Sequence, residues 1–243
     1  NFPKAKEASK EEIKLIANGF AESSERAMKA GFDGVEIHAA NGYLYYQFID
    51  PKQNLRTDEY GGSAENNARA VIEAVNLVRQ AIGDKKLISV RLSQDGVDDF
   101  EGQWPDGVKY AQELGKSFSN SKVDCLHWSS FDWKDNKDVS SNTPMSKIIR
   151  ESSGLPMIVN GGISDGHDCE EILTSDSGDI CAVGRPLFAH PDWPHIIRSG
   201  EKYNWIEFDR KYVIKPTYDY SYGYPLDLKK SNWNPDLMIR KQK

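Results

Sequence analysis

The chain has 243 residues, of which 38% are hydrophobic, enough to bury a sizeable core and within the range of a single α/β barrel domain. Its formal net charge of −6, with basic residues scattered among acidic ones, excludes a general attraction to nucleic acid or anionic lipid and favours a small-molecule partner. Since no apolar run approaches the roughly 20 residues of a membrane helix and no signal peptide is recognisable, we expect a cytoplasmic protein that does not enter a membrane.

Helix and strand signals alternate along the chain. Ser9 and Glu12 have the spacing of a capping box and predict the start of a helix, which Gly31 ends. The elements predicted after it are strand 35–39, helix 64–82, strand 87–92, helix 105–118, strand 123–128, helix 143–151, strand 156–160, helix 168–175, strand 180–183 and helix 192–199. The helix after position 142 is expected to use Thr143 as its cap and Pro144 in its first turn.

Five strands alternating with helices favour a parallel sheet with right-handed crossovers, either closed as a barrel or open and doubly wound. An open dinucleotide-binding sheet calls for G-x-G-x-x-G after its first strand, and that pattern is missing from the sequence. Instead, Gly161-Gly162 follows one late strand and Gly184-Arg185 follows the next. Because barrels bind phosphate after their seventh and eighth strands, these sites favour the barrel.

The sequence also carries a resemblance to a known family. The segment GFDGVEIHAANGYLYYQFIDPKQNLRTDEYGGSAENNAR resembles the Old Yellow Enzyme family of flavin-dependent oxidoreductases, and SVRLS, IVNGGI and VGRPLFAHPDW follow in the family's order. This resemblance, from about residue 8 to about residue 195, implies a TIM (β/α)8 barrel that holds FMN at its carboxyl-terminal face. The five predicted strands would be the fourth to the eighth.

The first three barrel strands, with the flavin contacts that the family takes from them, would then be absent from the chain. Asn1 suits a piece of a longer protein, and an incomplete barrel would expose two strand edges and an apolar interior. We therefore expect either a missing N-terminal segment or a second copy, in a homo-oligomer, to complete the barrel. Residues 1–243 are expected to form a single FMN-binding barrel domain with an irregular tail over 200–243.

The resemblance implies roles for single residues. His38 and Asn41 would donate hydrogen bonds to a substrate carbonyl oxygen, and Tyr43 would act as general acid at the α-carbon of the activated C=C bond. Arg91 would hold negative charge on the reduced flavin. The FMN phosphate would be bound by Gly161, Gly162, Gly184 and Arg185. Each residue also has a structural alternative: loop hydrogen bonds, aromatic packing, a buried salt bridge or an ordinary turn.

The function expected from this resemblance is NAD(P)H-dependent reduction of α,β-unsaturated carbonyl compounds, with hydride passing from the flavin to the β-carbon. One alternative is a non-catalytic or assembly-dependent barrel fragment that holds no flavin by itself. A phosphate-binding barrel of non-redox chemistry is another.

Other residues receive structural interpretations. Arg56 and Asp58 are expected to form a local ion pair that shapes their loop. His127 either lines the pocket or packs within its strand. The three cysteines are far apart without a C-x-x-C pair, and are expected to be reduced and mostly buried, and no metal site is predicted.

Overall fold

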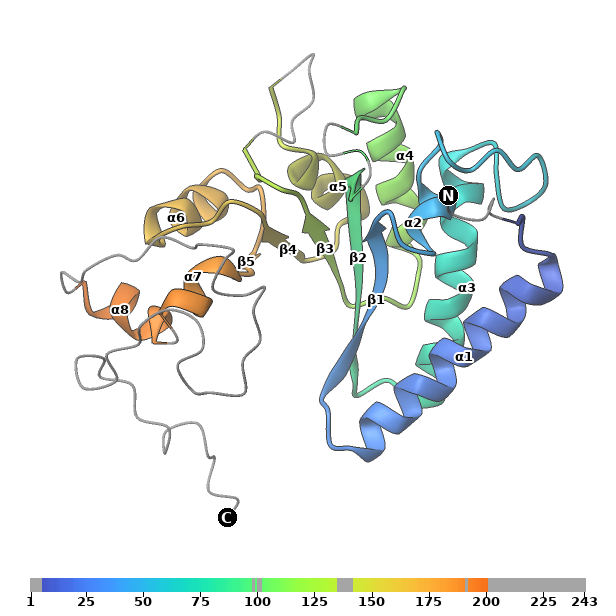
Figure 1. Cartoon of the computed structure of the whole chain (residues 1–243), viewed down its shortest axis with the longest axis horizontal. Coiled ribbons are helices and arrows are strands. Elements are labelled where there is room, and N and C mark those ends of the chain that lie inside the picture. The colour runs from blue at the N-terminus through green and yellow to red at the C-terminus, as the bar shows by residue number, and fades with distance from the viewer. Residues whose placement is uncertain (1–5, 98, 100–101, 135–141, 191, 201–243) are drawn as a thin grey trace, which may run out of the picture. The chain divides into compact units, whose positions relative to one another are not determined.

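The computed structural model describes residues 6–97, 99, 102–134, 142–190 and 192–200. Its five strands form one parallel sheet in chain order, and every connection between neighbouring strands contains a helix (Figure 1). The strands are β1 (Gly34–Asn41), β2 (Leu87–Gly96), β3 (Cys125–Ser129), β4 (Met157–Asn160) and β5 (Ile180–Cys181). The predicted alternation is therefore confirmed, with β1 and β5 at the two edges of the sheet among the described residues.

The helices match the expected positions to within a few residues. They are α1 (Lys10–Lys29), α2 (Tyr46–Ile49), α3 (Ala64–Ile82), α4 (Gly107–Ser119), α5 (Met145–Ser153), α6 (Gly166–Thr174), α7 (Arg185–Ala189) and α8 (Trp193–Ser199). Neither α2 nor α7 was predicted, because helices of four or five residues are too short to show a 3.6-residue period. Among the described residues, no helix has both the length and the apolar character to cross a membrane.

Two helix starts show where local sequence signals succeed and fail. The predicted capping box is confirmed in α1, where Glu12 N donates to Ser9 Oγ at 3.2 Å and Ser9 N donates to Glu12 Oε2 at 2.7 Å. The cap predicted for α5 is wrong. Its N-cap is Pro144, which has an extended ψ of 135° and makes no side-chain cap, so the helix begins one residue later, at Met145.

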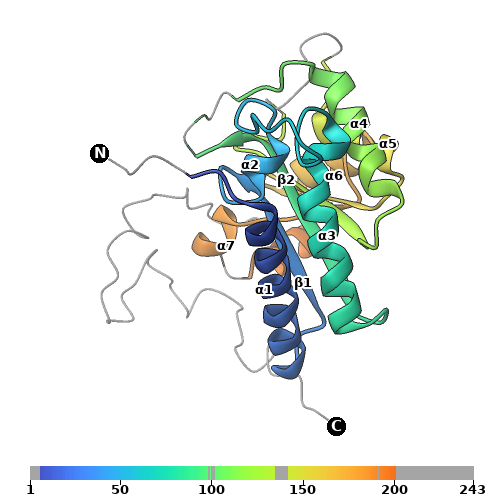
Figure 2. The ribbon, with the colours of Figure 1, turned by 90° about the vertical axis from the view of Figure 1, so that its right-hand side faces the viewer.

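The two faces of the sheet differ in chemistry. Helices α1, α3, α4 and α5 cover one face (Figures 1 and 2), and that face is apolar. Its side chains are at most 1% exposed: Ile37, Ala39, Ile88, Val90, Leu92, Leu126, Trp128, Met157 and Val159. Because strand side chains alternate, the other face carries Glu36, His38, Ser89, Arg91, Ser93, His127, Ser129 and Asn160. The expected apolar interior is therefore wrong: among the described residues this face is mostly polar.

The chain divides into two compact units. The first comprises Asn1–Gly162 with Ile172–Cys181 and contains the whole sheet. The second comprises Ile163–Glu171 and the chain from Ala182 onward, with α7 and α8 in its described part. Most of the tail predicted for 200–243 lies outside the described residues. The three cysteines are half-buried, where mostly buried side chains were predicted.

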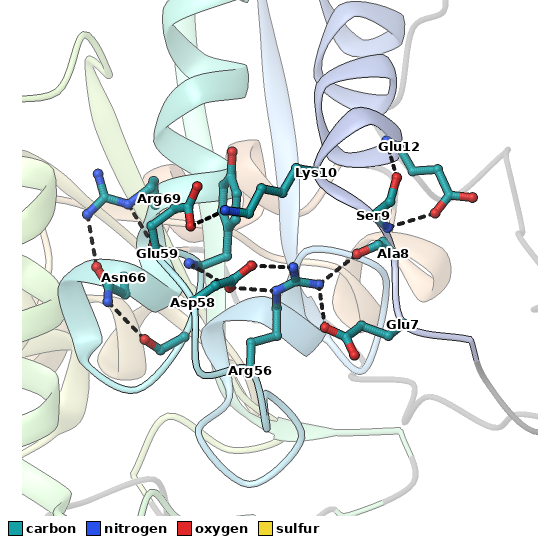
Figure 3. Close-up of polar contacts among 12 residues, drawn as sticks. Glu7, Ala8, Ser9, Lys10, Glu12, Arg56, Asp58, Glu59, Asn66 and Arg69 are labelled. Atoms are coloured by element: carbon teal, nitrogen blue, oxygen red, sulfur yellow. Dashed lines mark hydrogen bonds and ion pairs between the residues drawn. The ribbon is translucent and has the colours of Figure 1, made fainter.

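Hydrogen bonds and ion pairs connect the loop after α2 to the start of α1 and the segment that precedes it (Figure 3). Arg56 donates from Nε and Nη2 to the two carboxylate oxygens of Asp58, at 2.9 and 2.6 Å, which confirms the predicted ion pair. Its Nη1 donates to Ala8 O at 2.7 Å and lies 3.1 Å from Glu7 Oε1, and Lys10 pairs with Glu59 at 2.6 Å. These contacts join two segments that are about 50 residues apart, so the ion pair does more than shape its own loop.

The Arg56–Asp58 pair predicts a pH dependence of stability. The hydrogen bonds from Arg56 lower the pKa of Asp58 from 3.8 to about 2. Because this pKa is depressed in the folded state, the stabilisation is complete above pH 4 and is lost as the pH falls towards 2. The stability difference between the wild type and Asp58→Asn, measured by urea unfolding, should fall to roughly half of its pH 7 value near pH 3. An equal difference at pH 7 and pH 3 would contradict this assignment.

Candidate active site

Strand β1 contains two of the residues selected from the sequence, His38 and Asn41. His38 lies within the strand, half-buried on the polar face, and is paired in register with Arg91 of β2. The register shifts between Ala39 and Asn41, and Asn41 has a φ of +59°, a left-handed conformation that asparagine tolerates better than most residues. Its backbone N–H donates to Ser93 Oγ at 2.7 Å. This bond fixes the turn by which the chain leaves the strand end.

The three tyrosines after this turn are distinguished by their burial. Tyr45 and Tyr46 are 1% and 2% exposed, and the hydroxyl of Tyr46 donates to Gln94 O at 3.1 Å, so they pack within the fold. Tyr43 is 56% exposed, and its ring lies against that of His38, with 5.0 Å between centroids and 45° between planes. The structure therefore brings Tyr43 and His38 together, with the phenol accessible to a ligand.

The charge on His38 is set by its surroundings. Burial lowers the pKa of His38 below its ordinary 6.5, and the positive charge of Arg91 lowers it further, while Glu36 opposes both. At neutral pH the ring is therefore uncharged and carries a single proton. Its Nδ1 is buried without a hydrogen-bond partner among the described residues. An uncharged imidazole in this position suits a hydrogen bond to a carbonyl oxygen.

The guanidinium of Arg91 is held from the neighbouring strands. Its Nη2 donates to Ser129 Oγ of β3 at 3.0 Å, and to Oδ1 of Asn160 at 2.8 Å when that amide is oriented with its oxygen towards the cation. Its Nε is buried without a partner. No carboxylate among the described residues forms a salt bridge with Arg91, so the alternative of a buried ion pair finds no support in this part of the chain.

The glycine pair after β4 packs against the loop that follows β3. Gly161 and Gly162 have φ values of +123° and +64°, which favour glycine. A Cβ at Gly161 would collide with Ser130 O, and one at Gly162 would come 2.9 Å from the Asp132 carboxyl carbon. Trp133 N donates to Gly161 O at 3.2 Å. Close packing therefore already explains these glycines, and among the described backbone hydrogen bonds outside helices and strands none uses their N–H groups.

The second predicted phosphate position belongs to the second unit. Gly184 is the N-cap of α7, with a φ of −114°, and Arg185 is the first residue of that helix. A Cβ at Gly184 would meet nothing within 4 Å, so neither its backbone conformation nor its described neighbours require a glycine there. Joint binding of one phosphate by both glycine segments remains a prediction.

Several polar residues of this region were missed from the sequence. Ser93 fixes the turn at Asn41, and Ser129 and Asn160 hold Arg91. Counting in steps of two from Arg91 along its strand would have placed Ser93 on the same face, because alternate side chains share a face. Glu36 would have emerged in the same way. Ser129 and Asn160 lie on other strands, which this count does not reach.

Comparisons with known proteins agree with the fold. Residues 1–204 match the model of the NADH:flavin oxidoreductase / NADH oxidase family. The chain is 35% identical to an NADPH dehydrogenase of Clostridium acetobutylicum, covering 86% of this chain and 60% of that protein. It is 34% identical to a cinnamate reductase of Clostridium sporogenes, over 83% of this chain and 33% of that protein. A structure of morphinone reductase with tetrahydroNAD superimposes with a TM-score of 0.69 and 29% identity. The match covers 84% of this chain and 54% of that structure.

The class of protein is identified by the parallel sheet, the order of the motifs and the family match. The chain belongs to the NADH:flavin oxidoreductase / NADH oxidase family, and its resemblance to Old Yellow Enzyme is confirmed. It spans about half the length of the curated relatives it matches, and its sheet corresponds to part of the TIM barrel of morphinone reductase.

The residues present fit the FMN that this family implies. Arg91 offers an unpaired, buried Nε–H on the polar face, and His38 offers an unpaired, buried ring nitrogen beside it. The N–H groups of Gly161 and Gly162 are available to an anion. A flavin ring edge rich in acceptors and a phosphate would satisfy these groups, although the Asp132 carboxylate beside Gly162 would repel the phosphate charge.

Proposed function

We propose that the protein to which this chain belongs is an FMN-dependent, NAD(P)H-using oxidoreductase that reduces the activated C=C bond of α,β-unsaturated carbonyl compounds. The observation that carries the proposal is the pairing in register of an uncharged His38 with Arg91 on the polar face of β1 and β2. The exposed Tyr43 lies with its ring against that of His38. Relatives named NADPH dehydrogenase, cinnamate reductase and morphinone reductase support the same chemistry.

In this proposal FMN, once reduced by NAD(P)H, supplies hydride to the β-carbon of the acceptor. His38 and Asn41 donate hydrogen bonds to the carbonyl oxygen of the acceptor and withdraw electron density from its C=C bond. Tyr43 delivers a proton from its hydroxyl to the α-carbon. Arg91 places positive charge beside the cofactor, and Gly161, Gly162, Gly184 and Arg185 bind its phosphate.

Tyr43→Phe tests the assigned proton donor. Removing the hydroxyl should slow alkene reduction at least about 100-fold, because general acid catalysis contributes that much or more. Reduction of the flavin by NAD(P)H should be unchanged, since it needs no proton from Tyr43. Rapid-reaction measurements on the FMN-loaded protein separate the two half-reactions.

Tyr45→Phe is the matched control, because Tyr45 is a neighbouring but buried phenol. It should leave both half-reactions as they are. Unchanged alkene reduction in Tyr43→Phe would remove Tyr43 from the mechanism, while the family membership would stand.

The alternative is a non-catalytic or assembly-dependent fragment that needs an N-terminal segment, or a second copy, before it holds flavin. The coverage of about half of each solved relative favours it, as do the two sheet edges at β1 and β5. Retention of FMN by the 243-residue chain alone distinguishes the two proposals.

A further inference from the structure

A polar pair, the buried His127 and the more exposed Glu36, lies on the same face of the sheet as His38 and Arg91. Glu36 precedes His38 by two residues on β1, and its Oε2 lies 2.9 Å from Nδ1 of His127 on β3. Ser89 of β2 donates to the same oxygen at 2.9 Å. These three strands therefore share one hydrogen-bonded group, for which the proposed function has no role.

The pair defines where the proton of His127 resides. Burial raises the pKa of Glu36, but hydrogen bonds from His127 and Ser89, together with the charge of Arg91, outweigh it and leave that pKa below its ordinary value. An ionised carboxylate can only accept, so Nδ1 of His127 must carry a proton and donate it. When the ring carries this proton alone, the other nitrogen, Nε2, is an acceptor.

That acceptor has no partner among the described residues. The His127 side chain is only 8% exposed, and its Nε2 is buried. Leaving such a group unpaired is unfavourable, so a partner is expected. His127 is paired in register with Arg91, whose Nε–H is likewise buried and unpaired. One water molecule that accepts from Arg91 and donates to His127 would satisfy both groups.

We propose that Glu36 and His127 are positioning residues for Arg91. Glu36 holds His127 with its proton on Nδ1, and Nε2 of His127 then accepts, through one water molecule, from Nε–H of Arg91. Ser129 and Asn160 hold Nη2 of the same guanidinium. Nη1 has no partner among the described residues and is left for a ligand acceptor; that this ligand is FMN rests on the proposed function.

The first test measures which nitrogen of the His127 ring carries the proton, and it needs no cofactor. Nitrogen-15 NMR of the 243-residue chain should show the His127 ring protonated on Nδ1 and unprotonated on Nε2. Glu36→Met removes the acceptor with little change of volume, and should move the proton to Nε2. Arg91 Nε–H should then exchange with water at least about tenfold faster, since a lost hydrogen bond of about 1.4 kcal/mol is a factor of ten.

Glu25→Met is the matched control, because it removes an exposed carboxylate from α1 and should alter neither signal. A wild-type ring protonated on Nε2, or an Arg91 Nε–H unaffected by Glu36→Met, would overturn the proposal. Circular dichroism of Glu36→Met establishes that the fold is retained.

A double-mutant cycle tests whether Glu36 acts through Arg91. Glu36→Met should weaken FMN binding about tenfold in the wild type and have no effect in an Arg91→Met background. An equal loss in both backgrounds would show that Glu36 acts on the cofactor by another route, and would overturn the positioning role. If the 243-residue chain binds no FMN, the assembly-dependent alternative is favoured, and the NMR results alone decide the positions of the proton and of Arg91.

Discussion

Replacing Arg91 by methionine is expected to weaken FMN binding about 100-fold. Hydrogen bonds to charged groups contribute roughly 1.5–3 kcal/mol, and about 2.7 kcal/mol corresponds to a factor of 100. The loss should be large because no described carboxylate forms a salt bridge with Arg91, so its N–H groups are available to a ligand. Quenching of flavin fluorescence during titration with the protein gives the dissociation constant directly.

Arg26→Met is the control for this substitution, since Arg26 is an exposed cation on α1. It should leave the dissociation constant unchanged. If the dissociation constant of Arg91→Met for FMN is within twofold of the wild-type value, Arg91 does not bind the cofactor. Its contacts to Ser129 and Asn160 would then only stabilise the sheet.

Gly161→Ala should cost about 2 kcal/mol of stability, because its φ of +123° is unfavourable for alanine and its Cβ would collide with Ser130 O. The loop after β3 would have to move away from the turn after β4. Urea unfolding of the 243-residue chain measures the cost, and an unchanged midpoint would show that the two loops do not pack as described.

Gly184→Ala separates packing from phosphate binding. With a φ of −114° and open space around the new methyl group, it should change stability by less than about 0.5 kcal/mol. If the backbones of Gly161 and Gly184 both contact the phosphate closely, Gly161→Ala and Gly184→Ala should each weaken FMN binding by about tenfold. A loss of affinity in Gly161→Ala alone would restrict the phosphate site to the turn after β4.

The sequence predicted the fold from signals that act locally. Strand 87–92 places Ile88, Val90 and Leu92 on one face. Helix α3 carries one apolar face between the cap at Ser63 and the stop at Gly83. These patterns specify the alternation, and the alternation specifies a parallel sheet. The length of β2 was underestimated, because the residues beyond Leu92 are polar and become part of the strand through long-range pairing, as in the Asn41–Gly96 register.

The site was predictable only as far as the motifs extend. His38, Asn41, Tyr43 and Arg91 were selected by resemblance, and the placement of His38 beside Arg91 follows from the parallel pairing of β1 and β2. The contacts around them were not predictable, because Ser93, Ser129 and Asn160 are ordinary polar residues in sequence. Their partners lie on other strands, tens of residues away, and depend on the register that the fold establishes.

The most direct measurement is the visible absorbance of the purified 243-residue chain after incubation with FMN and gel filtration. We expect a flavin band that elutes with folded protein, because Arg91 and the glycine turn after β4 present unpaired donors on a preformed polar face. The eluted mass would show whether a second copy is needed. A folded chain that elutes without flavin would contradict the assigned cofactor contacts and would favour the fragment that holds no flavin by itself.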